Sequence, residues 1–396
     1  MPSEAQSKLV KELERDLAEL RARDQLRSFA QIAGVNLCSN DYLGLAQDSR
    51  LKESVLEAVA GSVRVGGTGS RLLSGHDPVW DELEEEFAAL ARTETALYFA
   101  NGYAANLGLL SSLLGKGDLV FSDALNHASL IDGIRLSGAR KEVYPHVDLN
   151  ALERALQRYE SEPCRKLIVT ESVFSMDGGI ADVHGLQGLA ERYGASLVVD
   201  EAHATAVQGP GGAGIVAKAR LTGDVFATVH TCGKALASAG AFVCGARVLR
   251  EYLINHARTL IFSTAMPPYV AWQIRAALRL AREMDAEREA LQANSAELIR
   301  SLRGDGWDTS ESASQIVPVI IGSNQEALSA AGFLQEQGFA VRAIRPPTVP
   351  ARTARLRLSL TARVSREQVT GIRAALQNWR RSQSSLAAAE VATGRG

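Results

Sequence analysis

The chain is poor in cysteine, and its four cysteines lie far apart. Cys38, Cys164, Cys232 and Cys244 form no CxxC pair. Structural zinc sites use cysteines at short spacings, and disulfide frameworks are typical of small, cysteine-rich secreted domains. The sequence therefore predicts reduced thiols in a cytoplasmic protein, with no disulfide and no metal site.

Long apolar runs and an excess of one charge are also missing. No run reaches 18 apolar residues, and the charged first 20 residues lack the apolar core of a signal peptide. We therefore expect neither a membrane span nor a secretion signal. The 43 basic and 45 acidic residues give a formal net charge of -2. This balance gives no reason to expect a nucleic-acid partner.

Apolar residues, by contrast, are plentiful. They make up 46% of the 396 residues, which is enough for a large core and more than one domain. Short, continuous apolar runs alternate with helical patterns, as is typical of a mostly parallel sheet covered by helices. The expected strands are 95–100, 118–123, 166–172, 196–203, 224–229 and 241–245, with helices such as 104–114, 149–160 and 183–193 between them.

The two ends of the chain differ from this middle part. Leucines at helical spacing among charges predict an amphipathic N-terminal helix, which a short strand follows. We expect three parts: a helix and strand segment (1–46), a large α/β domain (47–267) and a smaller α+β domain with a frayed tail (268–396). The last part should contain one long helix from 268 to 303, strands at 315–322, 339–346 and 355–360, and helices at 324–337 and 365–380.

Polar side chains follow five of the expected strands. Ligands bind at the carboxyl ends of the strands in open α/β sheets, so we expect these segments to form one site. They are Asn101-Gly102-Tyr103, Asn126-His127, Phe174-Ser175-Met176-Asp177-Gly178, Asp200-Glu201-Ala202-His203 and His230-Thr231-Cys232-Gly233-Lys234.

Several common kinds of site do not fit these segments. Gly67-Thr68-Gly69 begins like a dinucleotide fingerprint but lacks the third glycine, and Gly233-Lys234-Ala235 lacks the other residues of a P-loop. Neither HExxH nor GxSxG occurs. Asp200 and His203 could ligate a metal, but no third ligand lies at a sensible spacing.

Pyridoxal 5′-phosphate (PLP) fits better. It requires a lysine for an imine, a carboxylate for the ring nitrogen, a flat group against the ring and donors for the phosphate. A helix that begins near Gly102 would offer free N–H groups to that phosphate. Each residue alone has a simpler interpretation, such as a solvated lysine or a turn glycine, so the inference rests on their joint order. The sequence offers Lys234, Asp200 and His127 for the first three needs, and Gly102, Tyr103 and Thr231 for the last.

These motifs, in this order, resemble those of the α-oxoamine synthases. That family contains fold-type I PLP-dependent transferases, which condense an amino acid with an acyl thioester and release carbon dioxide. The likeness extends from about residue 10 to about residue 380. It implies a homodimer with a shared active site, and a mostly parallel central sheet flanked by helices.

The resemblance also implies a role for each residue of the cofactor site. Lys234 would hold PLP as a Schiff base and act as the base, and Asp200 would pair with the ring nitrogen. His127 would stack on the ring, and His203 would bond its hydroxyl. Glu171 and Ser175 would line the site, Gly102, Tyr103 and Thr231 would hold the phosphate, and Thr264 beside Ser263 would reach the cofactor of the neighbouring subunit.

Three further stretches concern the substrate. SNDYLGLA (39–46), IRPPTVP (344–350) and ARLRLSLTA (354–362) favour a member that condenses L-alanine with a pimeloyl thioester in biotin synthesis. The thioester would be carried by coenzyme A (CoA) or by an acyl carrier protein. By the resemblance, Asn40 and Arg357 would hold the alanine carboxylate, and Arg27 is a candidate for the far carboxylate of the acyl chain. A relative that uses glycine or serine and a non-catalytic structural subunit stay open as alternatives.

Four positions depart from the family pattern. Trp80 stands where the family usually has histidine, and Ala204 where serine or glycine is common. Ala206 and Ala237 stand at positions that are often glycine. These departures leave the core set of residues intact and bear on the shape of the substrate pocket.

Overall fold

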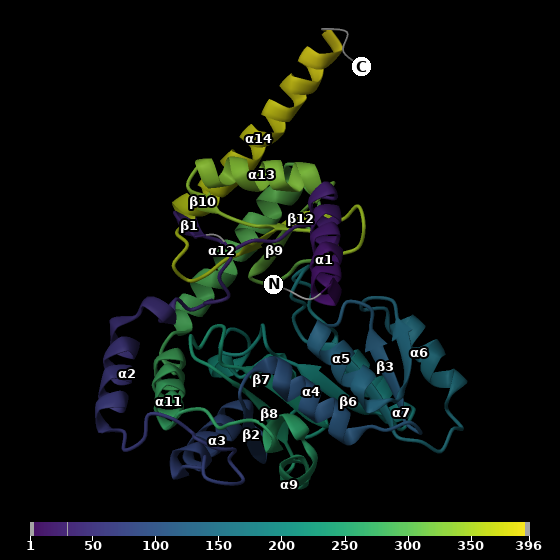
Figure 1. The fold of residues 1–396 in the computed structure, drawn as a ribbon, viewed down its shortest axis with the longest axis vertical. Helices are drawn as coiled ribbons and strands as arrows, with labels where there is room; N and C mark the ends of the chain where they lie inside the picture. The colour runs from purple at the N-terminus through teal and green to yellow at the C-terminus, as the bar shows by residue number, and fades with distance from the viewer. Residues whose placement is uncertain (1–3, 30, 393–396) are drawn as a thin grey trace.

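The structure is a computed structural model that describes residues 4–29 and 31–392. Figure 1 shows a broad body that contains the large sheet, and a narrower part above it from which the last helix projects. Within the described ranges, no helix is both long enough and apolar enough to cross a membrane, and no group of three or more metal-ligating side chains comes together.

A seven-stranded sheet forms the centre of the broad body. Its strands are β2 (Thr95–Phe99), β3 (Leu119–Asp123), β4 (Arg140–Tyr144), β5 (Lys166–Glu171), β6 (Ser196–Asp200), β7 (Ala227–Thr231) and β8 (Ala241–Gly245). Their order is β2-β8-β7-β6-β5-β3-β4, and only β8 runs antiparallel to its neighbours. The predicted mostly parallel sheet is confirmed. The sequence does not reveal β4, because this edge strand is mostly polar and exposed.

Helices cover both faces of this sheet, and each face has its own apolar core. One face is covered by α4 (Gly102–Leu113), α5 (Ala128–Ser137), α9 (Arg247–His256) and α10 (Arg258–Ile261). The other is covered mainly by α3 (Pro78–Ala91), α6 (Leu149–Arg158), α7 (Val183–Arg192) and α8 (Ile215–Lys218). Asn101 and His127 accept backbone N–H groups as the N-caps of α4 and α5, so two strand ends turn at once into helices.

The C-terminal part is built on a smaller antiparallel sheet in the order β11-β12-β9. Its strands are β9 (Ile316–Gly322), β11 (Ala343–Ile344) and β12 (Ala354–Ser359), with α13 (Asn324–Glu336) and α14 (Arg366–Ala392) beside them. The tail that we expected to fray from about residue 384 is helical as far as Ala392. Its alanine-rich sequence explains this, because alanine has the highest helix propensity.

The single long helix predicted from 268 to 303 is wrong. The chain instead forms α11 (Pro268–Arg282) and α12 (Asp285–Gly304). The buried side chain of Arg288 donates to the carbonyl of Ala281 at 2.6 Å and to Asp285 Oδ1 at 2.6 Å. A carbonyl that a continuous helix would bond internally is therefore bonded by a side chain, which allows the break.

The N-terminal segment is joined to the C-terminal part rather than to the large sheet. This segment contains α1 (Glu4–Ala22) and the strand β1 (Val35–Asn36), and α2 (Ser49–Gly61) follows it. β1 pairs in parallel with β10 (Phe339–Ala340). Ser359 N–H donates to the carbonyl of Leu37, and Ala362 N–H to that of Tyr42. These bonds bring residues 37–42 beside β12. The proposed boundaries at 46 and 267 stay predictions.

Two of the alanines that depart from the family pattern have left-handed backbones. Ala206 has φ 63° and Ala237 has φ 45°. A β-carbon makes this conformation costly, which explains why glycine is common there. Ala237 N–H donates to the carbonyl of Lys234 at 2.9 Å and so closes the turn that carries this lysine. Trp80 is fully buried and stacks on Tyr98, with 4.3 Å between the ring centroids.

Replacement of Ala237 by glycine should stabilise the protein, because glycine adopts this backbone conformation without steric strain. We expect the free energy of unfolding to rise by about 0.5–1 kcal/mol, measured by urea denaturation. Ala213→Gly is the matched control, because Ala213 is buried at φ -70° and should lose stability. Equal losses in the two variants would contradict this explanation.

Candidate active site

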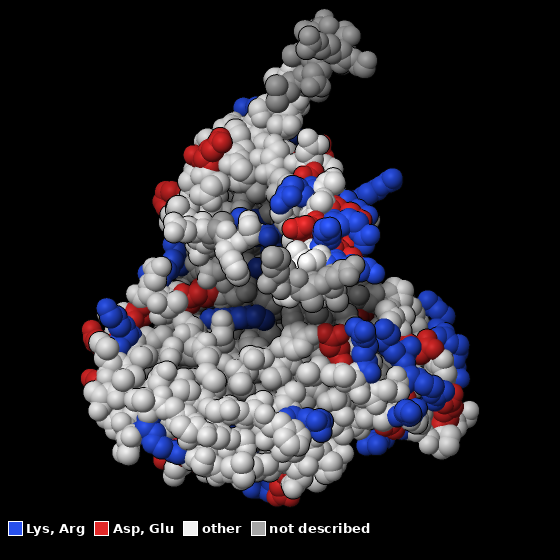
Figure 2. All heavy atoms as spheres, in the orientation of Figure 1, with Lys and Arg blue, Asp and Glu red and all other residues white. Residues whose placement is uncertain are grey.

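The site lies at the carboxyl edge of the large sheet, where it faces the C-terminal part. Glu171 and Asp200 end the neighbouring strands β5 and β6 and are register partners. Thr231 ends β7, and Lys234 follows it. Figure 2 shows a hollow between the broad body and the upper part, with basic side chains along it. The segments predicted from strand ends therefore meet at one edge.

Lys234 is partly buried at the centre of this group. Its Nζ lies 3.0 Å from Nε2 of His203. Burial lowers the pKa of the Lys234 amine, the negative charges of Asp200 and Glu171 raise it, and Arg357 lowers it further. The net direction is downward, so a larger fraction of this amine is neutral than for a solvated lysine.

Asp200 accepts hydrogen bonds at both carboxylate oxygens. Oδ1 accepts from Ala202 N–H at 2.8 Å, and Oδ2 accepts from Asn106 Nδ2 at 2.7 Å. The same Asn106 amide donates to Ser129 Oγ at 2.9 Å. Sequence reasoning missed Asn106, because its burial and its distant partners are apparent only in the folded chain.

His127 is held as a neutral imidazole. Its Nδ1 accepts the backbone N–H of Ser129 at 3.3 Å and lies 2.8 Å from Ser129 Oγ. Burial lowers the pKa of His127, Asp200 raises it, and Lys234 lowers it again. An Nδ1 that accepts an amide hydrogen carries no proton itself, so the single ring proton is on Nε2.

Glu171 is the second carboxyl group of the site, and it is buried. Burial raises its pKa well above the ordinary value, and the negative charge of Asp200 raises it further. Its Oε1 has no hydrogen-bond partner in the part of the chain that the structure describes. Glu171 therefore holds its proton more tightly than an exposed glutamate would.

The expected phosphate donors lie at the first turn of α4. The first N–H groups of a helix, here those of Gly102 and Tyr103, have no partner within the helix. A β-carbon on Gly102 would approach Thr231 Cγ2 to 2.6 Å, so glycine is required and Thr231 lies directly beside the helix end. Thr231 Oγ1 bonds the carbonyl of Ala202 at 3.3 Å. The Tyr103 hydroxyl donates to Asp132 and is 43% exposed as a residue.

These residues fit PLP as their ligand. Asp200 is buried with its carboxylate held in place, the Lys234 amine has a lowered pKa, and His127 is a flat neutral ring. The free N–H groups at the start of α4 suit the phosphate dianion. Glu171 adds a buried oxygen that has no partner among the described residues.

Arg357 and Asn40 come to this edge from outside the large sheet. Arg357 Nη2 donates to Asn40 Oδ1 at 3.1 Å, Nη1 donates to Ser359 Oγ at 2.6 Å, and Nε donates to the carbonyl of Ser175 at 2.5 Å. Ser175 thus takes part through its backbone. Three of the five guanidinium N–H groups are bonded, and two remain for a carboxylate.

The structure does not bring Arg27 and Thr264 to Lys234. Arg27 Nη2 donates to Thr348 Oγ1 at 2.9 Å and lines a cavity of about 620 Å³, together with Arg21, Arg342 and Arg345. Thr264 lines a small separate cavity beside Trp80. Both residues lie on the surface of a single chain, where their predicted roles depend on a ligand or on a second subunit.

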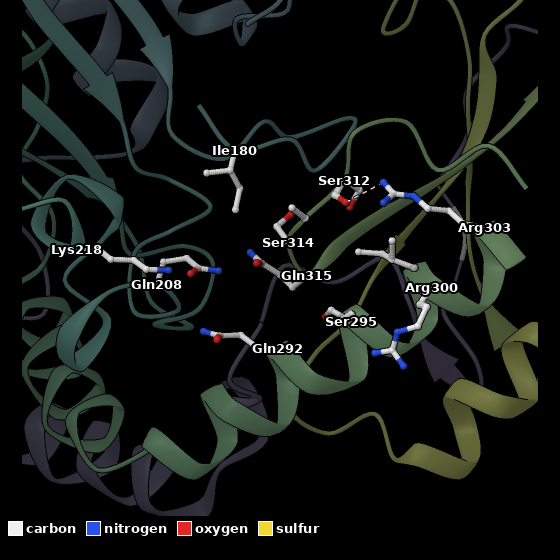
Figure 3. Close-up of a pocket in the computed structure, with 13 residues that line it drawn as sticks. Ile180, Gln208, Lys218, Gln292, Ser295, Arg300, Arg303, Ser312, Ser314 and Gln315 are labelled. Atoms are coloured by element: carbon white, nitrogen blue, oxygen red, sulfur yellow. Dashed lines mark hydrogen bonds between the residues drawn. The ribbon is translucent and has the colours of Figure 1, made fainter. Parts of the chain in front are cut away.

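A further cavity of about 560 Å³, which no sequence motif predicted, lies on the other side of Gln315. Figure 3 shows Gln208, Gln292 and Gln315 around its inner part, with Arg300 and Arg303 toward one side. Gln315 Nε2 donates to the carbonyl of His203 at 2.7 Å, so this amide separates the cavity from the site and fixes the His203 backbone.

His146 anchors the segment that contains Ser175. Nδ1 lies 2.9 Å from Asp123 Oδ1, and Nε2 lies 2.8 Å from Asp177 Oδ2. Burial lowers the pKa of His146, but the bonds and charges of Asp123 and Asp177 outweigh it and raise the pKa to about 9. The imidazolium therefore ties the loop after β5 to the end of β3.

The aminotransferase class I and II family model matches residues 32–376. This chain belongs to that family. A curated 8-amino-7-oxononanoate synthase of Aromatoleum aromaticum is 47% identical over 367 residues, which cover 89% of this chain and 94% of the relative. A second, of Geobacter sulfurreducens, is 46% identical over 363 residues, which cover 88% of this chain and 92% of the relative.

Solved structures of this family share the fold. A serine palmitoyltransferase of Sphingomonas wittichii has a TM-score of 0.88 at 30% identity and covers 97% of this chain and 100% of its own. An 8-amino-7-oxononanoate synthase from Francisella tularensis has a TM-score of 0.77 at 28% identity, and the match covers 89% of this chain and 99% of the synthase. Another palmitoyltransferase structure contains PLP. The predicted α-oxoamine synthase resemblance and fold-type I architecture are confirmed.

The raised pKa of His146 predicts how stability depends on pH. A folded pKa of about 9 lies above the ordinary 6.5, so the contribution is complete below pH 6.5 and is lost as pH rises through 9. The free energy of unfolding, measured in urea from pH 6 to pH 9.5, should fall more steeply in the native chain than in His146→Gln. Parallel curves for the two proteins would show that the imidazolium contributes nothing.

Proposed function

We propose that this chain is an 8-amino-7-oxononanoate synthase, which condenses L-alanine with a pimeloyl thioester in biotin synthesis. The observation that carries the proposal is the single site that joins the Lys234 amine to Asp200, His127 and the Arg357–Asn40 pair. The synthases are 46–47% identical to this chain, against 30% for the serine palmitoyltransferase, which favours alanine over serine. A structural subunit is disfavoured because Lys234, Asp200 and His127 are all present.

The cofactor is PLP, which when bound supplies an electron-accepting ring that stabilises negative charge at the α-carbon of the amino acid. Lys234 would hold it through Nζ, and Asp200 would accept the hydrogen of the ring nitrogen. Neutral His127 would lie against the ring without adding a positive charge there. The N–H groups of Gly102 and Tyr103 would bind the phosphate with the Thr231 hydroxyl.

Lys234 has a second role as the base. Its lowered pKa increases the fraction of neutral amine, and this amine takes the α-proton of alanine. Arg357 uses its two remaining N–H groups to hold the alanine carboxylate, and Asn40 fixes the guanidinium in that orientation. The new carbon–carbon bond replaces the thioester C–S bond, and the thiol of the acyl carrier leaves. The held carboxylate then leaves as carbon dioxide, and a proton takes its place on the α-carbon.

The acyl chain has a candidate site of its own. Arg27 lies in a cavity with three further arginines, and Cys38, two residues from Asn40, also lines it. The cavity thus adjoins the segment that carries the carboxylate-binding asparagine. We assign the far carboxylate of the pimeloyl group to Arg27, because an arginine cluster supplies the charge that a carboxylate requires.

Turnover with different amino acids tests the proposed function. Protein loaded with PLP should release CoA from pimeloyl-CoA when L-alanine is added, and at least tenfold more slowly with glycine or L-serine. Lys234→Ala should lower the rate by more than a thousandfold and leave the fold unchanged by circular dichroism. Lys218→Ala removes an exposed lysine and should keep the full rate. Serine as the preferred substrate, or turnover without Lys234, would overturn the proposal.

We also propose that two copies of the chain form a homodimer in the cytoplasm. Large apolar side chains are exposed around Thr264, which agrees with a surface that a second copy covers. Val63 is 100% exposed, Leu73 is 84% exposed and Phe262 is 71% exposed. The segments that contain Leu73 and Phe262 are joined, because Ala265 N–H donates to the carbonyl of Gly69. Thr264 would then lie at the active site of the partner subunit.

Charges placed on this patch should separate the subunits. The double variant Leu73→Glu, Phe262→Glu should elute as a monomer in size-exclusion chromatography with light scattering, and its synthase rate should fall at least tenfold. Val143→Glu is the control, because Val143 is 53% exposed on β4 at the opposite edge of the sheet. A native chain that is monomeric and fully active would refute the shared site.

A further inference from the structure

A chain of hydrogen bonds joins Arg357 to Lys234 through three side chains. Arg357 Nη2 donates to Asn40 Oδ1 at 3.1 Å, and the Tyr42 hydroxyl lies 3.0 Å from the same oxygen. That hydroxyl lies 2.6 Å from Nδ1 of His203, and Nε2 of His203 lies 3.0 Å from Lys234 Nζ. Three of these distances fall within the range of normal hydrogen bonds, and the contact between Tyr42 and His203 is a short one.

Only one order of donors and acceptors satisfies this chain. Arg357 has donors alone, so the Asn40 atom that faces it is the carbonyl oxygen. An oxygen has no hydrogen to give, so the single hydrogen of the Tyr42 hydroxyl points to Asn40. The Tyr42 oxygen must then accept the hydrogen of His203 Nδ1.

The protonation states agree with this order. Burial lowers the pKa of His203 well below its ordinary value, and the positive charges of Lys234 and Arg357 lower it further. Burial raises the pKa of Tyr42, and Arg357 opposes this rise. His203 is therefore neutral with a single ring hydrogen, and Tyr42 keeps its phenolic hydrogen.

We propose that Tyr42 is a positioning residue that holds His203 as the Nδ1–H tautomer, so that Nε2 presents its lone pair to Lys234. The fixed charge of Arg357 sets the direction of every hydrogen in the chain. The group that binds the substrate carboxylate and the amine that moves the α-proton are thereby the two ends of one hydrogen-bonded unit.

The surroundings of His203 make this tautomer depend on Tyr42. Gln315 holds the His203 carbonyl at 2.7 Å, which fixes the backbone but leaves the ring hydrogen undetermined. Among the described residues, Tyr42 is the partner of Nδ1. Tyr42 itself is fully buried, so Tyr42→Phe removes one oxygen and keeps the packing of the ring.

The inference rests on the proposed function, and its test has one arm that needs no turnover. Protein with ¹⁵N-labelled histidine and bound PLP is compared by NMR with Tyr42→Phe, and the His203 signals are assigned from His203→Asn. In the native chain, the shifts should show Nδ1 protonated and Nε2 unprotonated; in Tyr42→Phe, the two forms should mix. Tyr193→Phe is the matched control. The Tyr193 hydroxyl also has two side-chain partners, Gln157 and Glu153 on α6, but Tyr193 lies at the end of α7 and contacts none of the proposed site residues through them.

The second arm is kinetic. Tyr42→Phe should lower kcat about tenfold, in line with the loss of one buried hydrogen bond. It should change the KM for L-alanine less than twofold, because Arg357 keeps its bonds to Ser175 and Ser359. Tyr193→Phe should change neither value.

The outcomes separate the two proposals. A native His203 with Nε2 protonated, or an unchanged tautomer and kcat in Tyr42→Phe, would overturn the role of Tyr42. The predicted tautomer in a protein that makes no product from alanine would overturn the proposed function alone and leave the hydrogen-bond order in place.

Discussion

A lysine amine that is partly buried among charged groups stays reactive only if its neighbours have defined protonation states. In this site, each neighbour is defined by its own surroundings. Asp200 accepts hydrogen bonds at both oxygens, and burial beside Asp200 raises the pKa of Glu171. Burial and the nearby cations lower the pKa of His203. The amine therefore lies in a fixed electrostatic environment, which pre-organises the site for its chemistry.

The fold provides this environment through the register of the parallel strands. Glu171 and Asp200 are partners across β5 and β6, so their carboxyl groups are forced to share one region of low solvent access. Burial raises the pKa of Glu171, and the nearby negative charge of Asp200 raises it further. The helix caps at Asn101 and His127 turn the chain sharply beside these strands. Site geometry here follows from secondary structure that is buried and regular.

Much of this could be predicted from the sequence, because the information was local. Continuous apolar runs fixed six strands of the large sheet, and the polar residues after them fixed its functional edge. Asn106, Tyr42 and His146 could not be found in this way, because their partners lie between 23 and 161 residues away along the chain. The break between α11 and α12 also depends on the buried side chain of Arg288. This side chain bonds the carbonyl of Ala281 and the side chain of Asp285, and it is held by the distant carbonyl of Ala206 at 3.3 Å. The resemblance to a family supplied the roles of the site residues, whereas the order of donors and acceptors from Arg357 to Lys234 follows only from the structure.

The residues proposed for the chemistry and those proposed for the substrate lie on different parts of the chain. Lys234, Asp200 and His127 lie on the large sheet and its helices, whereas Asn40 and Arg357 lie on segments joined by the β1–β10 pair and by the bond from Ser359 to Leu37. Figure 1 shows β1, β10 and β12 together in the upper part. A family built in this way can keep one catalytic edge and change its substrate by altering the upper part. Contacts that cross between the two parts, such as Tyr42 to His203, therefore connect the proposed carboxylate site to Lys234 through side chains alone.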